Sequence, residues 1–366
     1  MIRELDPAEA LVRQQAGALL IDVREDSERA AGLPAGAIPL PLARVATDIA
    51  GCAERDSELL LICAAGMRSL RAASQLRALG YTNLASIRGG CGAWRTQDLP
   101  WAGAQESPDF LERFDRHLRL PQVGLEGQRR LQRARVAIVG AGGLGSPVAL
   151  YLAAAGVGHI RLIDDDRVDR SNLQRQVLHT DAAVGEYKVD SARERLLALN
   201  PHLDLDTRAQ RLGADNIERL FDGVELVVDG SDNFPTRYLV SDACVKLGLP
   251  MVYGAVERFT GQVGVFAAGV KRGQSPCYRC LFPEPPLEAP NCAEAGVLGV
   301  LLQANEALKF LLGIGRVLDG RVLSVDALQM GFREIGVPPD PGCAVCAPGR
   351  EFPGYADYGR FCSAGG

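Results

Sequence analysis

The sequence predicts an α/β protein with two domains, a small one followed by a larger doubly wound one. A chain of 366 residues is too long for one typical hydrophobic core and long enough for two. Apolar strand-like runs alternate with helical stretches twice, before and after the Pro- and Gly-containing segment 99–108. We therefore expect a first domain over residues 1–104, a second over 109–347 and a loosely held tail over 348–366.

The composition is that of a folded protein whose partners are proteins or small molecules. Hydrophobic residues make up 47%, charged residues 23%, and the formal net charge is −5, so neither nucleic acid nor a membrane is an expected partner. The N-terminal residues lack the basic start and apolar run of a secretion signal, which predicts a cytoplasmic location. Thiols stay reduced there, so ten cysteines indicate metal binding or sulfur chemistry.

Apolar runs and turn residues place the main elements in order. In the first domain, buried parallel strands are expected at 18–23, 59–62 and 84–87, with a helix at 69–79. In the second, a helical segment near 110–118 precedes a strand–helix–strand unit at 135–139, 147–155 and 159–163. Further strands are expected at 226–229 and 251–253, and antiparallel ones at 261–267 and 321–325.

A Gly-rich turn connects the strand at 135–139 to the next helix. Its glycines, Gly140, Gly142, Gly143 and Gly145, let the backbone approach phosphates at a helix N-terminus. Asp164 ends the following strand, where a carboxylate can accept hydrogen bonds from ribose hydroxyls. Together these residues indicate a site for an adenine nucleotide.

Polar residues beyond this turn distinguish ATP from a dinucleotide. A triphosphate with Mg²⁺ needs cations and a carboxylate, whereas hydride transfer needs no such cluster. Arg175, Lys188 and Asp232 provide that set. Taken singly they could be solvated helix faces and a helix cap, but as a set they favour ATP.

Four cysteines occur as two C-x-x-C pairs, Cys277 with Cys280 and Cys343 with Cys346. Each pair can hold one edge of a tetrahedral ion, and four thiolates leave no open position, which predicts a structural Zn²⁺ site. A redox pair or simple packing are the alternatives.

Cys63 lies between the strand at 59–62 and the next helix, on a loop that also contains Gly66 and Arg68. A thiolate or persulfide there would face backbone N–H groups, a helix N-terminus and a guanidinium, all of which lower the pKa of a thiol. The loop predicts a reactive cysteine, and the alternative is a buried structural thiol.

From about residue 110 to 347 the sequence resembles the MoeB/ThiF family of adenylating enzymes, which is related to the ubiquitin-activating enzymes. The matching segments, in the family's order, are GAGGLG, DDDRVDRSNLQRQ, GEYKVDSA, VVDGSDN, PCYRC, EAGV and PGCAVC. The resemblance implies an α/β fold with a mixed sheet, bound ATP and Mg²⁺, and zinc on the four cysteines.

The resemblance also implies individual roles. Asp164 would hold the ribose, and Asp166 would be a further acidic residue of the pocket. Asn172, Arg175 and Lys188 would bind the phosphates.

Three more residues take roles from the same family. Asp232 would bind Mg²⁺, and Arg116 would reach the partner's ATP across a homodimer interface. Cys292 matches a position that in relatives can bond to the substrate or to sulfur. The segment between Val297 and Gln303 is shorter here than is usual in the family.

Residues 5–102 resemble a single rhodanese domain. The matching parts are 21–25 near its start, the loop 63–69, and Gly89 and Gly90 followed by Ala93 and Trp94. In fused relatives this domain usually follows the adenylating domain, whereas here it comes first.

Together the resemblances imply ATP-dependent adenylation of the C-terminal Gly-Gly carboxylate of a ubiquitin-like sulfur-carrier protein. Persulfide sulfur from Cys63 would then give a thiocarboxylate, as in molybdopterin-synthase activation, with a cysteine desulfurase or thiosulfate as sulfur donor. The alternatives are a non-catalytic scaffold for carrier and donor, or a nucleotide-linked oxidoreductase joined to a rhodanese. No short motif selects the carrier or its pathway.

Overall fold

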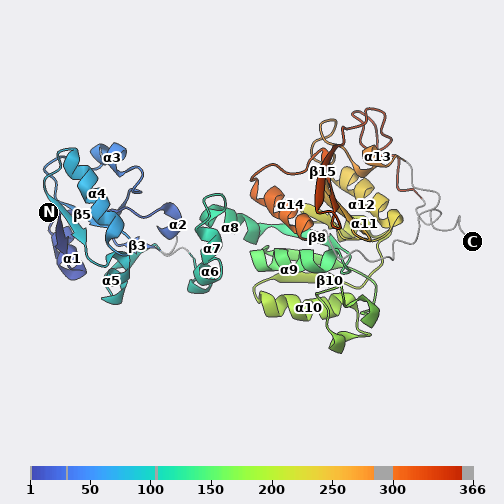
Figure 1. The fold of residues 1–366 in the computed structure, drawn as a ribbon, viewed down its shortest axis with the longest axis horizontal. Coiled ribbons are helices and arrows are strands. Elements are labelled where there is room, and N and C mark those ends of the chain that lie inside the picture. The colour runs from blue at the N-terminus through green and yellow to red at the C-terminus, as the bar shows by residue number, and fades with distance from the viewer. Residues whose placement is uncertain (1, 30–31, 104–105, 284–299, 357–366) are drawn as a thin grey trace, which may run out of the picture. The chain divides into compact units, whose positions relative to one another are not determined.

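The computed structural model describes residues 2–29, 32–103, 106–283 and 300–356 (Figure 1). Contacts divide the chain into two compact units, Met1–Gln128 and Arg129–Gly366. The division falls within helix α8 (Gly124–Arg133). It comes later than the domain limits at 104 and 109, which stay a prediction.

Strands and helices alternate along unit 1. Its strands are β1 (Arg3–Leu5), β2 (Leu19–Asp22), β3 (Leu33–Pro34), β4 (Ile38–Pro39), β5 (Leu59–Ile62), β6 (Leu84–Ile87) and β7 (Trp101–Ala102). Its helices before α8 are α1 (Pro7–Gln15), α2 (Asp26–Arg29), α3 (Val45–Asp48), α4 (Met67–Ala78), α5 (Gly90–Thr96), α6 (Pro108–Arg113) and α7 (Asp115–Leu118).

The five-stranded sheet of unit 1 has the order β1-β6-β5-β2-β4, and all its pairings are parallel. Successive residues of a strand point to opposite faces. Ile21, Leu59 and Leu61 enter one core cluster, and Leu20 and Leu60 enter another. Both faces of the sheet are therefore buried, which is why its central strands are continuous apolar runs in the sequence.

Unit 2 holds the larger sheet. Its strands are β8 (Arg135–Val139), β9 (His159–Ile163), β10 (Asp204–Arg208), β11 (Leu226–Asp229), β12 (Met251–Glu257), β13 (Thr260–Phe266), β14 (Arg321–Asp326) and β15 (Gly331–Gly336). Its helices are α9 (Gly145–Ala155), α10 (Lys188–Leu199), α11 (Ile217–Leu220), α12 (Phe234–Leu247), α13 (Tyr278–Leu281) and α14 (Val300–Leu312).

This eight-stranded sheet has the order β10-β9-β8-β11-β12-β13-β14-β15. The pairings from β10 to β12 are parallel, and those from β12 to β15 are antiparallel. Helix α9 contacts α10 and α14, whereas α12 contacts α11 and α13, so helices cover both faces (Figure 1). The result is the predicted doubly wound fold with a mixed sheet.

The carboxyl ends of three parallel strands lie level with one another. Val139 at the end of β8 pairs with Ile163 of β9 and with Asp229 of β11. The chain leaves β8 toward β9 on one side, and β11 lies on the other side, so the strand order reverses here. Loops that follow strands at such a reversal form the usual ligand site of a doubly wound sheet.

Residues 348–356 contact other parts of unit 2, and the predicted tail over 348–366 stays a prediction. Arg272 donates a hydrogen bond to the Arg350 carbonyl at 2.6 Å. The Lys246 ammonium lies 5.4 and 5.2 Å from the ring centroids of Phe352 and Tyr355.

Within the described part of the chain, no helix has the length and apolar character needed to cross a bilayer.

Candidate functional site

A cavity of about 300 Å³ opens where β8, β9 and β11 end. Most residues predicted to bind the nucleotide line it, namely Gly140, Gly142, Gly143, Asp164, Asp166, Arg175, Lys188 and Asp232. Gly145 and Asn172 are not among its lining residues. Gly145 instead begins α9, and a Cβ there would lie 1.7 Å from the Gly140 carbonyl oxygen, so close packing requires a glycine.

The Gly-rich loop is held through the backbone N–H and carbonyl of Ala141. Its N–H donates to Asp164 Oδ2 at 2.7 Å. Its carbonyl accepts hydrogen bonds from Ser146 Oγ at 2.8 Å and from His179 Nε2 at 2.9 Å. Both backbone groups of Ala141 are therefore hydrogen-bonded within the chain, which holds the loop in place.

His179 is a supporting residue that the sequence does not reveal. Because a carbonyl oxygen only accepts, Nε2 of this ring carries the proton that goes to Ala141. Nδ1 then accepts a hydrogen bond from Ser191 Oγ at 3.0 Å. Burial lowers the pKa of His179, which keeps the ring neutral and this arrangement intact at neutral pH.

Asp164 is oriented by two backbone groups. Its Oδ2 accepts the Ala141 N–H, and its Oδ1 accepts the Asp166 N–H at 2.8 Å. Burial raises the pKa of this carboxyl group, against the lowering effect of Lys188. Each carboxylate oxygen can accept a further hydrogen bond, so Asp164 suits a pair of ribose hydroxyls.

Both cationic side chains predicted to bind phosphate line the same cavity. Lys188 is buried, and its Nζ donates to Asp166 Oδ2 at 2.8 Å, while the Asp166 side chain is 70% exposed. Arg175 forms no ion pair with any described residue. Both cations are therefore available to an anionic ligand, Lys188 by exchange of its exposed partner.

The loop that carries Asp232 rests on a buried network. Asp229 Oδ1 accepts hydrogen bonds from the Ser231 N–H at 3.0 Å and from its hydroxyl at 2.6 Å. Arg237 donates to the Ser231 carbonyl at 2.9 Å, and Gln303 of α14 donates to the Asp229 carbonyl at 2.7 Å. The network fixes the loop backbone, so the Asp232 carboxylate is presented to the cavity, where an oxygen donor suits Mg²⁺.

For two predicted residues, Arg116 and Cys292, the structure gives no relation to this cavity. Arg116 is exposed on α7, which belongs to unit 1. Cys292 lies outside the described residues. The roles of both stay predictions.

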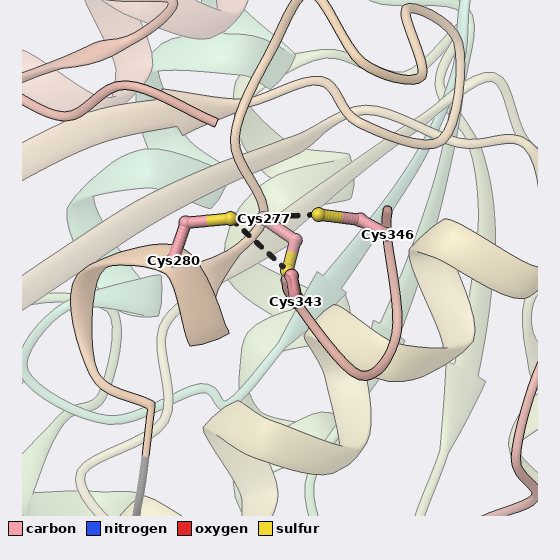
Figure 2. A group of neighbouring side chains, drawn as sticks. All are labelled: Cys277, Cys280, Cys343 and Cys346. Atoms are coloured by element: carbon pink, nitrogen blue, oxygen red, sulfur yellow. Dashed lines mark hydrogen bonds between the residues drawn. The ribbon is translucent and has the colours of Figure 1, made fainter. Parts of the chain in front are cut away.

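The four cysteines predicted to hold zinc do come together (Figure 2). Cys277 and Cys280 belong to the start and body of α13, while Cys343 and Cys346 lie on the loop after β15. Their Sγ atoms all lie within 4.8 Å of one another, and three of the separations are 3.4, 3.6 and 4.0 Å. Four sulfurs about 2.3 Å from one tetrahedral ion would be roughly 3.8 Å apart, so the cluster fits such an ion.

Protons are shared unequally within this cluster. Hydrogen bonds among the thiols lower the pKa of Cys280 to about 7 and that of Cys343 further, while they raise the pKa of Cys277 and Cys346. The four thiols therefore differ in how readily each loses its proton. A divalent cation that displaced the remaining protons would be held by four thiolates.

Cys63 directly follows β5 at the carboxyl edge of the unit 1 sheet, and 1% of its surface is exposed. Its Sγ accepts the Gly66 N–H at 3.1 Å and lies 3.5 Å from Ser69 Oγ. Burial raises the pKa of this thiol, but hydrogen bonds from Ser69 and from the backbone of Ala65 and Gly66 outweigh it, so the net shift is downward. The site stabilises an anion on sulfur without a direct cation.

The first residues of α5, Gly90 and Cys91, pack against the backbone of the Cys63 loop. The Cys91 N–H donates to the Cys63 carbonyl at 2.7 Å. A Cβ on Gly90 would lie 2.0 Å from the same oxygen, so only glycine fits there. The nearby Arg68, which is predicted to face the sulfur anion, forms an ion pair with Glu28.

Unit 2 is thus a doubly wound domain with a polar nucleotide-sized cavity, and unit 1 is a parallel α/β domain with a buried, anion-stabilising cysteine. Residues 114–345 match the model of the ThiF family, and residues 6–97 match that of the rhodanese-like domain. The chain belongs to the ThiF family and carries a rhodanese-like domain.

Curated relatives agree with this assignment. The chain is 52% identical to the sulfur carrier protein adenylyltransferase of Thermus thermophilus, over 69% of this chain and 96% of that protein. It is 46% identical to the probable adenylyltransferase/sulfurtransferase MoeZ of Mycobacterium tuberculosis, over 70% of this chain and 66% of that protein. E. coli MccB shares the fold, with a TM-score of 0.56 at 21% identity over 66% of this chain and 75% of that chain. These findings confirm the predicted family, fold class and class of enzyme.

Proposed function

We propose that the chain acts in the cytoplasm on a ubiquitin-like sulfur-carrier protein, whose C-terminal Gly-Gly carboxylate it adenylates with ATP. The observation that carries this proposal is the cavity of unit 2, where the Gly-rich loop, Asp164, Lys188, Arg175 and Asp232 lie together. This set contains groups suited to bind the ribose, the phosphates and a divalent cation together.

Catalysis at this site would be mainly positioning and charge neutralisation. Asp164 would orient the ribose, and the preformed Gly-rich loop would receive the phosphates next to Lys188 and Arg175. Mg²⁺, held by Asp232, would neutralise phosphate charge. The carrier's carboxylate oxygen then attacks the α-phosphorus, the bond to the β-phosphate oxygen breaks, and pyrophosphate leaves.

We propose further that Cys63 supplies the sulfur. Its persulfide attacks the carbonyl carbon of the acyl-adenylate, AMP leaves, and an acyl disulfide joins the carrier to Cys63. A second thiol, for which Cys292 is the candidate, then attacks the Cys63 sulfur, so that a Cys63–Cys292 disulfide forms, the sulfur–sulfur bond of the acyl disulfide breaks and the thiocarboxylate leaves. An external thiol reductant would then restore both cysteines. The hydrogen bonds from Gly66 and Ser69 that stabilise a thiolate would equally stabilise the persulfide anion.

The direct test of this function is exchange of labelled pyrophosphate into ATP with purified chain and a Gly-Gly carrier. Exchange that depends on the carrier supports the proposal. Binding of carrier and sulfur donor without exchange would point to a scaffold. Tight NAD binding without exchange would point to the oxidoreductase.

For the four-cysteine cluster we propose zinc, because four thiolates at this spacing are the usual ligands of a structural Zn²⁺ ion. Replacing Cys343 with Ser should reduce bound zinc from about one per chain to near zero and lower the melting temperature by about 10 °C or more. Elemental analysis and calorimetry measure the two effects. Cys52→Ser, at an exposed cysteine, is the control and should change neither. Full metal content in the Cys343→Ser protein would contradict the assignment.

We also propose a homodimer in which Arg116 acts on the ATP bound by the partner subunit. Arg116→Ala should reduce pyrophosphate exchange by about a hundredfold, and so should Asp232→Asn. A mixture of the two variants should recover up to about a quarter of wild-type activity, because one mixed dimer has one complete site. A monomeric chain with full activity, or no recovery in proven mixed dimers, would contradict this arrangement.

A further inference from the structure

The guanidinium of Arg68, on the active loop of unit 1, is fully engaged by one carboxylate. Arg68 Nη1 lies 2.6 Å from Glu28 Oε2, and Nη2 lies 2.5 Å from Glu28 Oε1. The Glu25 N–H donates to Glu28 Oε2 at 3.0 Å, which fixes the carboxylate from its other side. Burial raises the pKa of Glu28, but the bonds from Arg68 and Glu25 outweigh it, so the net shift is downward and the pair is ionised. Glu28 thus cancels the charge of Arg68.

A second arginine at the same sheet edge is compensated in the same way. Arg24 and Asp22 are both buried, and Arg24 Nη2 lies 2.6 Å from Asp22 Oδ2. The two positions after Cys63 are alanines and add no charge. These two pairs add no net positive charge beside Cys63, and its sulfur is stabilised by N–H and O–H groups instead.

This charge balance matters because sulfur donors differ in charge. With thiosulfate, the Cys63 thiolate attacks the outer sulfur, the S–S bond of the donor breaks, and sulfite leaves with two negative charges. With a cysteinyl persulfide, the thiolate takes the outer sulfur with its proton, and one thiolate leaves. Each reaction forms one S–S bond and breaks one. Only thiosulfate brings a doubly negative group to the reacting thiolate. The reaction with thiosulfate therefore depends far more on an uncompensated cation than the reaction with a persulfide does.

We propose that Glu28 is a specificity-determining residue, which disfavours thiosulfate by neutralising Arg68 and so selects a cysteinyl persulfide, whose reacting S–SH group is uncharged, as the sulfur donor. This inference rests on the proposed role of Cys63 in sulfur transfer. It assigns the discrimination to a residue outside the active loop, 40 positions before Arg68.

The test is a comparison of Glu28→Gln with wild type, using thiosulfate and cysteine persulfide as donors. Mass spectrometry of the full-length chain follows persulfide formation on Cys63. For Glu28→Gln we expect kcat/KM with thiosulfate to rise about tenfold, and kcat/KM with cysteine persulfide to change less than about twofold. Glu28→Ala, which also removes the carboxylate, should give the same gain.

Two further variants separate charge compensation from general effects. Asp26→Asn removes a negative charge from the same helix without touching Arg68, because Asp26 pairs with Arg29, and it should leave both donors unchanged. Adding Arg68→Ala to Glu28→Gln should abolish the gain with thiosulfate. An unchanged thiosulfate rate in folded Glu28→Gln and Glu28→Ala, or an equal loss with both donors, would overturn the inference. Absence of Cys63 persulfide in wild type with every donor would instead refute the proposed sulfur transfer.

Discussion

Replacing Asp232 with Asn is expected to reduce carrier-dependent pyrophosphate exchange at least about a hundredfold. The carboxylate lines the cavity and carries the negative charge that would hold Mg²⁺ against the phosphates. Asn keeps the size and one oxygen but loses that charge. Because Asp232 is exposed and the loop is held by Asp229, Ser231 and Arg237, the free energy of unfolding should change by less than about 0.5 kcal/mol.

A matched control is Asp190→Asn, which removes an exposed carboxylate from α10 that does not line the cavity. It should leave exchange within about twofold of wild type. Titration with Mg²⁺ should show that excess metal restores part of the lost rate in Asp232→Asn, because metal affinity is what the substitution lowers. Near-normal exchange in Asp232→Asn at low Mg²⁺ would show that Asp232 is not the metal ligand.

The sequence predicts the central strands of both sheets because these are buried on both faces. The strands at β5, β6, β8, β9 and β11 have the expected bounds. Strands β10 and β15 are missed, because they are edge strands whose sequences, DLDTR and GFREIG, carry charged residues among the apolar ones. Their pairing partners decide their structure, and those partners lie far away in the chain.

Within the candidate site, residues that belong to a local motif are predictable and residues that support them are not. The Gly-rich loop and Asp164 follow consecutive strands of one strand–helix–strand unit, so their meeting follows from topology. His179 reaches the Ala141 carbonyl from 38 residues away, and Gln303 reaches the Asp229 carbonyl from 74 residues away. Nothing in the sequence around either residue indicates its partner.

For Arg68 the sequence motif identifies the residue but not its ion-pair partner. Its position on the Cys63 loop places its charge within electrostatic range of the Cys63 sulfur. The ion pair with Glu28, which changes what that charge can do, depends on how α2 packs and is not encoded near the loop. Motifs identify the chemical groups of a site, whereas packing decides how their charges are balanced.

Cys63→Ala should separate the two proposed reactions completely. The groups proposed for adenylation, those of the unit 2 cavity and Arg116, do not include Cys63, so carrier-dependent pyrophosphate exchange should stay within about twofold of wild type. Thiocarboxylate formation needs a sulfur nucleophile. Cys63 Sγ accepts the Gly66 N–H and contacts Ser69 Oγ, and these contacts would stabilise an anionic sulfur nucleophile. Sulfur transfer should therefore fall to background, a loss of at least about a thousandfold.

Mass spectrometry of the carrier decides the outcome, because a terminal thiocarboxylate is heavier than the carboxylate by the difference between sulfur and oxygen. Cys52→Ser, at an exposed cysteine outside the loop, is the control and should still give thiocarboxylate at the wild-type rate. Cys292→Ser should keep exchange, and it should lose the thiocarboxylate only if Cys292 receives the acyl group or cleaves the acyl disulfide. If Cys63→Ala yields thiocarboxylate at the wild-type rate with the same donor, the sulfur does not pass through unit 1, and the anion-stabilising loop around Cys63 serves another reaction.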